Sequence, residues 1–318
     1  MFQIIHKELK MWNRKSFIRT SAAAAALIAT GQFPVSAMAA NENETTLTIL
    51  HTNDVHSRIE PFPMDGGKNQ GMGGAAPRAS LIKSIRAENN NVLLLDAGDI
   101  WQGTPYFNFF NGAVEYKVMN EMGYDASTLG NHDFDIGLEG LKRHLPSAKF
   151  SMLNANYDFE NTILHGMIEP YKVFDKNGVK VGVFGIGIEL EGLVPSQMYG
   201  DVKYNDPIKT ANTIAEKLKN EMACNFVICL SHLGYKYENK KVSDEILCAS
   251  TKNIDLILGG HTHTFFEKPL AYKNLDGREV LLNQVGWAGL MLGRLDFHFK
   301  KMSEKKHMKY SNTFITKS

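Results

Sequence analysis

The chain has 318 residues, of which 43% are hydrophobic and 22% are charged, and its formal net charge is +1. This composition is ordinary for a soluble globular enzyme with a sizeable buried core. The near-neutral charge argues against a nucleic-acid partner, which would call for a strongly basic surface.

The first 39 residues resemble a cleavable export signal. A basic region with Arg14, Lys15 and Arg19 precedes an apolar stretch over residues 22–30, and Ala37-Met38-Ala39 matches a signal cleavage site. The apolar stretch is too short to span a bilayer. The basic region also resembles a twin-arginine signal with lysine in place of the second arginine, so the export route stays open. The alternative is an amphipathic N-terminal helix. We expect a periplasmic or secreted protein with no membrane span in its mature form.

From residue 47 onward, short apolar runs alternate with helical patterns. Strands are predicted over 47–51, 92–95, 126–129, 151–154, 226–230, 254–258 and 290–299, and helices over 75–88, 113–122, 138–145, 208–222 and 244–249. Asn177-Gly178 and Asp276-Gly277 each indicate a hairpin. The pattern predicts one α/β domain with a mixed sheet over residues 40–300, followed by a basic C-terminal tail over 301–318.

The three cysteines do not form a recognisable framework. Cys229 lies in an apolar run and is expected to be a buried thiol. A bridge between Cys224 and Cys248 stays open. The lack of a C-x-x-C pair argues against a cysteine metal site.

Five apolar runs end directly in polar residues that can bind metals. These candidate ligands are Asp54, His56, Asp99, Asn131, His232, His261 and His263. Because ligands gather at the carboxyl ends of strands in α/β sheets, we expect the five ends to converge on one site.

Imidazole and carboxylate ligands suit Zn, Mn, Co or Fe. The absence of thiolates argues against a structural zinc site. Asp99 can bridge two divalent metal ions because a carboxylate has two oxygens. Such a pair can hold a bridging hydroxide and neutralise a phosphoryl group. His132 can donate a proton or a hydrogen bond to the phosphate, and Asp135 can orient it. Each fragment alone also has a structural explanation, such as a helix cap at Asn131 and Asp133, but the five together favour a metal site.

This set of motifs resembles the calcineurin-like metallophosphoesterase family. The matching residues are Asp54-x-His56, Gly98-Asp99, Gly130-Asn131-His132-Asp133, His232 and Gly260-His261-x-His263. Residues 50–54, 98–104 and 130–135 are similar to the catalytic domain of periplasmic and secreted 5′-nucleotidases.

The resemblance implies a four-layer α/β/β/α sandwich with mixed sheets. It also implies one metal held by Asp54, His56, Asp99 and His263, a second held by Asp99, Asn131, His232 and His261, and a catalytic dyad of His132 and Asp135.

The sequence departs from this family in two ways. Many of these nucleotidases have Gln at the position of His263, and histidine there should bind the first metal more strongly and add pH dependence below ~6.5. The family's C-terminal nucleotide-binding domain is expected to be absent. His51 and Asn53 are expected beside the ligands rather than on the metals. Trp101 is expected either to stack on a substrate or to anchor its loop.

The leading functional hypothesis is a metal-dependent phosphomonoesterase that acts on a small phosphate ester, in particular a nucleotide. One alternative is a cyclic-nucleotide or nucleotide-sugar phosphodiesterase. Another is a metal-binding subunit that is active only with a separate chain carrying the nucleotide-binding domain.

Overall fold

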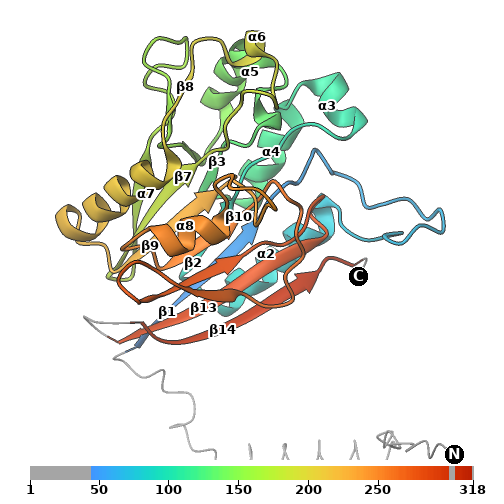
Figure 1. Cartoon of the computed structure of the whole chain (residues 1–318). Helices are drawn as coiled ribbons and strands as arrows, with labels where there is room; N and C mark the ends of the chain where they lie inside the picture. The colour runs from blue at the N-terminus through green and yellow to red at the C-terminus, as the bar shows by residue number, and fades with distance from the viewer. Residues whose placement is uncertain (1–43, 301–304, 317–318) are drawn as a thin grey trace, which may run out of the picture. The chain divides into compact units, whose positions relative to one another are not determined.

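The computed structural model describes residues 44–300 and 305–316, and the predicted export signal lies outside these residues. The first of two six-stranded sheets has four parallel strands at one end and an antiparallel hairpin at the other. Its strand order is β14 (Lys305–Phe314), β13 (Met291–Lys300), β1 (Glu44–Thr52), β2 (Val92–Asp96), β3 (Ala126–Thr128) and β4 (Ser151–Leu153) (Figure 1).

The second sheet has three parallel pairings at its centre and an antiparallel hairpin at each end. Its strand order is β11 (Leu270–Lys273), β12 (Glu279–Asn283), β10 (Leu256–Gly259), β9 (Phe226–Ser231), β7 (Val179–Ile186) and β6 (Tyr171–Lys176). Asn177 and Gly178 both have positive φ angles, as the predicted hairpin between β6 and β7 requires. A small separate sheet pairs β5 (Tyr157–Asp158) with β8 (Lys203–Tyr204).

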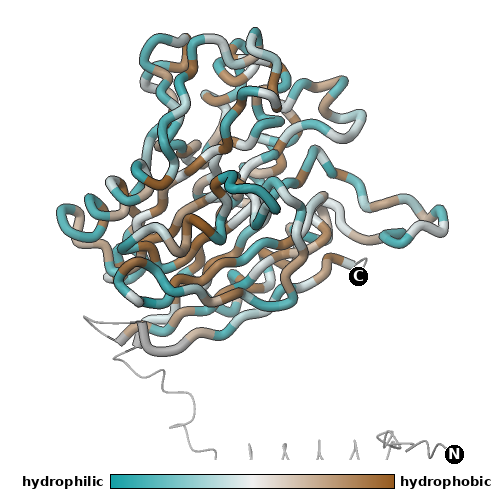
Figure 2. Tube along the Cα trace, in the orientation of Figure 1, coloured by the Kyte–Doolittle hydropathy of each residue, from teal (hydrophilic) through white to brown (hydrophobic). Residues whose placement is uncertain are grey.

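The strands are continuously apolar because both of their faces are buried. In β2, Leu93 and Leu95 pack into the core between the two sheets, whereas Leu94 packs against the helices outside the first sheet. In β9, Phe226 lies in the inter-sheet core and Val227 in the core outside the second sheet. Figure 2 shows hydrophobic segments along these strands. This double burial explains why the sequence does not alternate as a half-exposed strand would.

Helices cover the outer faces of the two sheets and complete four layers. Buried residues of α2 (Ala75–Glu88), α4 (Ala113–Met122) and α5 (Gly137–His144) belong to the core outside the first sheet. Buried residues of α7 (Pro207–Glu216) and α8 (Asp244–Ser250) belong to the core outside the second sheet. The predicted four-layer α/β/β/α arrangement is confirmed.

Shorter elements lie in the connections. They are α3 (Pro105–Phe110), α6 (Ser196–Tyr199), the 3₁₀ turns His132–Phe134 and Leu145–Ser147, and a π turn over Lys217–Glu221 that ends the helix predicted to run to residue 222. All three cysteines are free and buried, so the structure does not contain a Cys224–Cys248 bridge. No helix of the described residues is long and apolar enough to cross a membrane.

The segment expected as a basic tail over 301–318 instead contains β14, which forms the edge of the first sheet. Met308 packs against the inter-sheet core, and Ile315, just after the strand, is 2% exposed. Lys309 and Tyr310 are exposed. An edge strand with solvent on one side keeps charged residues, so its sequence lacks the apolar run that marks the central strands.

Candidate active site

The seven predicted ligands lie together at the carboxyl ends of five strands. Asp54 and His56 follow β1, Asp99 follows β2, and Asn131 follows β3. His232 follows β9, and His261 and His263 follow β10. Parallel neighbours end at the same edge of a sheet, so these short loops are brought close together.

The first donor group contains Asp54, His56 and His263, whose candidate ligand atoms all lie within 4.8 Å of one another. Nε2 of His263 lies 3.3 Å from Oδ1 of Asp54 and 3.0 Å from Nε2 of His56. The second group contains Asp99, His232 and His261, and meets the same limit. Oδ1 of Asn131 lies 2.8 Å from Nδ1 of His261, which adds a neutral oxygen to this group.

Asp99 lies between the two groups. Its Oδ2 atom is 3.1 Å from Nε2 of His232 and 3.8 Å from Nε2 of His56. Burial alone would raise the pKa of Asp99, but His232 and His56 hold that pKa well below its usual value. An ionised carboxylate in this position can contribute to both donor groups.

The donor chemistry fits a metal because two of the imidazoles are held in the tautomer that ligation requires. Nδ1 of His232 lies 2.6 Å from the carbonyl oxygen of Ala97, and Nδ1 of His56 lies 3.2 Å from that of Trp101. A carbonyl oxygen only accepts, so each Nδ1 donates, and each Nε2 is the nitrogen left to bind a metal once it is deprotonated. Nε2 of His232 is buried 3.1 Å from Oδ2 of Asp99, so a proton or a metal ion must lie between the two atoms.

The pKa values of the buried imidazoles depend on burial and on the charged groups around them. Burial disfavours the charged form of His232, but Asp99 and Asp54 outweigh this effect and raise its pKa to about 10. Burial and the neighbouring His232 lower the pKa of His261 to about 4. The carboxylates thus attract one positive charge into the site, and its presence keeps the adjacent imidazole neutral.

Five of the seven predicted ligands have left-handed backbone conformations. The φ angles are 49° for Asp54, 49° for His56, 55° for Asp99, 69° for His261 and 53° for His263. Such angles are uncommon for residues other than glycine and concentrate where the surrounding structure enforces them, including functional sites. The tight turns at the strand ends therefore constrain the ligands to this arrangement.

The Asp133 carboxylate joins the loop that carries Asp99 to the loop that carries Asn131. It accepts hydrogen bonds from the backbone N–H groups of Asp99, Ile100, Trp101 and Gly130, at 2.8–3.3 Å. Burial and the nearby Asp99 raise its pKa to about 7. The sequence alone indicated only a helix cap for Asp133, because three of these four partners lie more than thirty positions away.

His132 and Asp135 are brought together as the sequence indicated. Nδ1 of His132 lies 3.0 Å from Oδ2 of Asp135, and this hydrogen bond raises the pKa of His132. The His132 ring meets the His56 ring edge to face, with centroids 5.4 Å apart. His132 is therefore half-exposed beside the donor groups, with one nitrogen held by Asp135.

Two further expectations concern residues around the site. Asn53 donates to Oδ2 of Asp54 at 2.6 Å and so supports the first donor group, whereas Nε2 of His51 lies 2.8 Å from Nδ2 of Asn283, which is in neither group. Trp101 is fully buried and stacks on Tyr116, so it anchors its loop and has no surface to offer a substrate.

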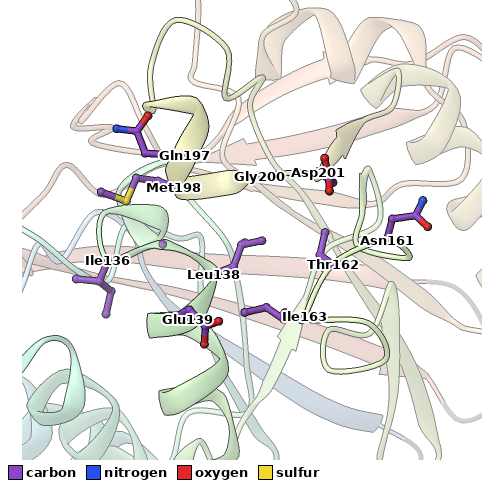
Figure 3. Close-up of a pocket in the computed structure, with 11 residues that line it drawn as sticks. Ile136, Leu138, Glu139, Asn161, Thr162, Ile163, Gln197, Met198, Gly200 and Asp201 are labelled. Carbon is purple, nitrogen blue, oxygen red and sulfur yellow. The ribbon is translucent and has the colours of Figure 1, made fainter.

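Two cavities adjoin the segment that carries the dyad. One, of about 510 Å³, is lined by residues 102–105, Phe107, Asn108 and Asp135. The other, of about 450 Å³, begins at Ile136 and lies between α5, residues 161–163 and α6 (Figure 3). None of the predicted metal ligands lines either cavity. The first cavity, which shares Asp135 with the dyad, is the better candidate for holding part of a substrate.

Known proteins are similar to this chain in sequence and in fold. A family model described as calcineurin-like phosphoesterase matches residues 47–265. A snake venom 5′-nucleotidase of Gloydius brevicauda is 38% identical over 273 residues, covering 80% of this chain and 45% of that protein. A trifunctional nucleotide phosphoesterase of Bacillus subtilis is 33% identical over 285 residues, covering 80% of this chain and 18% of that protein.

A solved structure described as a 5′-nucleotidase precursor from Thermus thermophilus has a TM-score of 0.76 and 32% identity. The match covers 86% of this chain and 55% of that structure. The chain spans about half the length of the snake venom relative and of this structure, and a smaller share of the Bacillus protein.

We expect the protein to bind two divalent ions. Metal analysis after mild dialysis in metal-replete buffer should find more than one equivalent per chain. Asp99→Asn should reduce occupancy of both sites, because the residue adjoins both donor groups. A stoichiometry at or below one in the unsubstituted protein would contradict the two-ion arrangement.

Asp133→Asn should destabilise the protein at pH 8, where the carboxylate is ionised. The amide nitrogen of asparagine would face backbone N–H groups, and each buried donor left unsatisfied costs about 1–3 kcal/mol. Urea unfolding measures the change. Asp175→Asn is the matched control, because this carboxylate accepts one N–H group, from Gly178, in an exposed turn. Equal free energies of unfolding for Asp133→Asn and the unsubstituted protein would contradict the role of Asp133.

Proposed function

The chain belongs to the calcineurin-like phosphoesterase family, and we propose that it is a 5′-nucleotidase-like phosphomonoesterase that uses two divalent metal ions. The observation that carries this proposal is the pair of donor groups that meet at Asp99, with His132 exposed beside them. The names of its relatives support a nucleotide as the substrate.

Each residue of the site has a distinct part in this proposal. Asp54, His56, Asp99 and His263 would hold one ion, and Asp99, Asn131, His232 and His261 the other. The bound ions would be Zn, Mn, Co or Fe, and would supply an activated water and positive charge for the phosphoryl oxygens. Trp101 and Ala97 fix the His56 and His232 rings through their carbonyl groups, so the protein sets the donor geometry in advance.

His132 is the proposed proton donor or hydrogen-bond donor to the phosphate. Asp135 holds its Nδ1 atom, which leaves Nε2 free to face the substrate. The raised pKa of His132 favours the protonated ring, which is the form that can stabilise a developing negative charge or protonate a leaving alkoxide.

The same donor groups can also serve a cyclic-nucleotide or nucleotide-sugar phosphodiesterase, because a two-ion centre recognises phosphate oxygens that all these esters share. A subunit that is active only with a separate nucleotide-binding chain is a further alternative. Turnover of a free nucleoside monophosphate by the purified chain would separate the leading proposal from both. We also propose that residues 1–39 direct export to the periplasm or the medium.

His132→Asn should leave metal binding nearly intact and slow the hydrolysis of substrates with poor leaving groups. Loss of a positioned acid costs ~10²–10⁴ in rate. An aryl phosphate, whose leaving group needs little protonation, should be affected less and is the control substrate. Loss of one metal equivalent in this variant would show that His132 is a ligand and that the dyad assignment is wrong.

We expect the purified chain to discriminate weakly between nucleosides. The cavity beside Asp135 is lined by amide, hydroxyl and aromatic side chains, without an arginine. The apolar contacts among these distinguish ligands by ~10–200-fold, and larger ratios require polar groups set to hydrogen-bond one particular base. The kcat/KM values for adenosine, uridine and sugar monophosphates should therefore fall within about two orders of magnitude. Selectivity beyond ~10⁴-fold for one nucleoside would contradict this expectation.

A further inference from the structure

His263 differs from the other histidine of the first donor group in how it is held. Its side chain is 39% exposed, compared with 7% for His56. Nδ1 of His56 is fixed by the carbonyl oxygen of Trp101, whereas no described residue forms a hydrogen bond with Nδ1 of His263. A ligating histidine is almost always oriented by such a hydrogen bond. Within the described residues, a contact of the ring itself is what can restrict the orientation of His263.

The Trp287 indole supplies that contact. Its ring lies parallel to the His263 imidazole, with an interplanar angle of 7° and centroids 5.7 Å apart. These values describe an offset stack, which is a favoured arrangement for aromatic pairs. The indole lies against one side of the imidazole and restricts rotation of the ring away from the position in which Nε2 faces Asp54 and His56.

Trp287 is itself held rigidly. Its ring meets Phe62 edge to face at 5.9 Å, and the Arg58 guanidinium lies 4.2 Å above the Phe62 ring. The next residue, Ala288, donates its backbone N–H to the carbonyl oxygen of Asp54 at 2.7 Å. The loop that carries Trp287 is thus tied directly to one of the proposed metal ligands.

We propose that Trp287 is a positioning residue for His263, and that it acts by stacking against the imidazole ring. The pairing depends on histidine at position 263, because a glutamine side chain has no ring to stack. The inference rests on the proposed metal centre. It predicts that Trp287 controls the affinity of one ion, the one that His263 holds, and leaves the other ion unaffected.

The test measures divalent-ion affinity by competition with a chromophoric chelator, using Zn²⁺ and Mn²⁺ and the whole mature chain. Trp287→Leu should weaken one of the two sites ~10–100-fold, as expected when the support of a ligand is lost. Trp287→Phe keeps a stacking ring and should retain most of the affinity. Phe109→Leu removes an aromatic ring that is 78% exposed on α3, and is the matched control.

A double-mutant cycle separates positioning from general packing. In a His263→Gln background, Trp287→Leu should change metal affinity little, because the stacked partner is already gone. Thermal unfolding of each variant checks that the protein is folded. If Trp287→Leu does not fold, Trp287→Phe and Trp287→Tyr provide conservative replacements.

Three results are decisive. Unchanged affinity at both sites in Trp287→Leu would overturn the role of Trp287. An equal loss in the His263→Gln background would also overturn it, because the effect would not pass through His263. Failure of the unsubstituted protein to bind two ions would instead overturn the proposed metal centre, and with it the basis of this inference.

Discussion

The architecture of the site depends on the burial of carboxylates at the edge of the two sheets. Asp54 and Asp99 are almost fully buried, and Asp133 lies directly behind Asp99. An ionised carboxylate in such surroundings is costly unless hydrogen bonds or positive charge compensate it. Asp133 accepts hydrogen bonds from four backbone N–H groups, whereas Asp54 and Asp99 accept fewer and instead face the imidazoles of the site. The remaining negative charge is what makes this place a cation site.

The topology of the fold brings these carboxylates and imidazoles together. Two sheets pack face to face, and their parallel strands end at one common edge, so loops from five strands reach one point. The loops are short and have little conformational freedom, and left-handed turns direct their side chains inward. A rigid set of donors favours tight binding, because little conformational freedom is lost when a ligand binds.

The sequence predicted the central strands, most helices and the convergence of the seven candidate ligands, because each left a local pattern. Continuous apolar runs identify doubly buried strands, and Asp54-x-His56 or His261-x-His263 places two donors on one loop. It did not predict what depends on distant partners. The β14 strand lacks an apolar run, and Asp133 binds a loop more than thirty positions away. The stack between Trp287 and His263 could not be predicted either, because no sequence motif relates the two positions.

The order in which the chain is made has a consequence for metal choice. The donors are spread from Asp54 to His263, and the Trp287 loop follows them, so a growing polypeptide has no complete donor group until most of it has been synthesised. β1 also lies beside β13, a strand from near the other end of the chain. Metal sites of this kind do not exist in the unfolded chain. The proposed ions would therefore be selected where folding finishes, and the free metal concentrations of that compartment would decide which ions the protein carries.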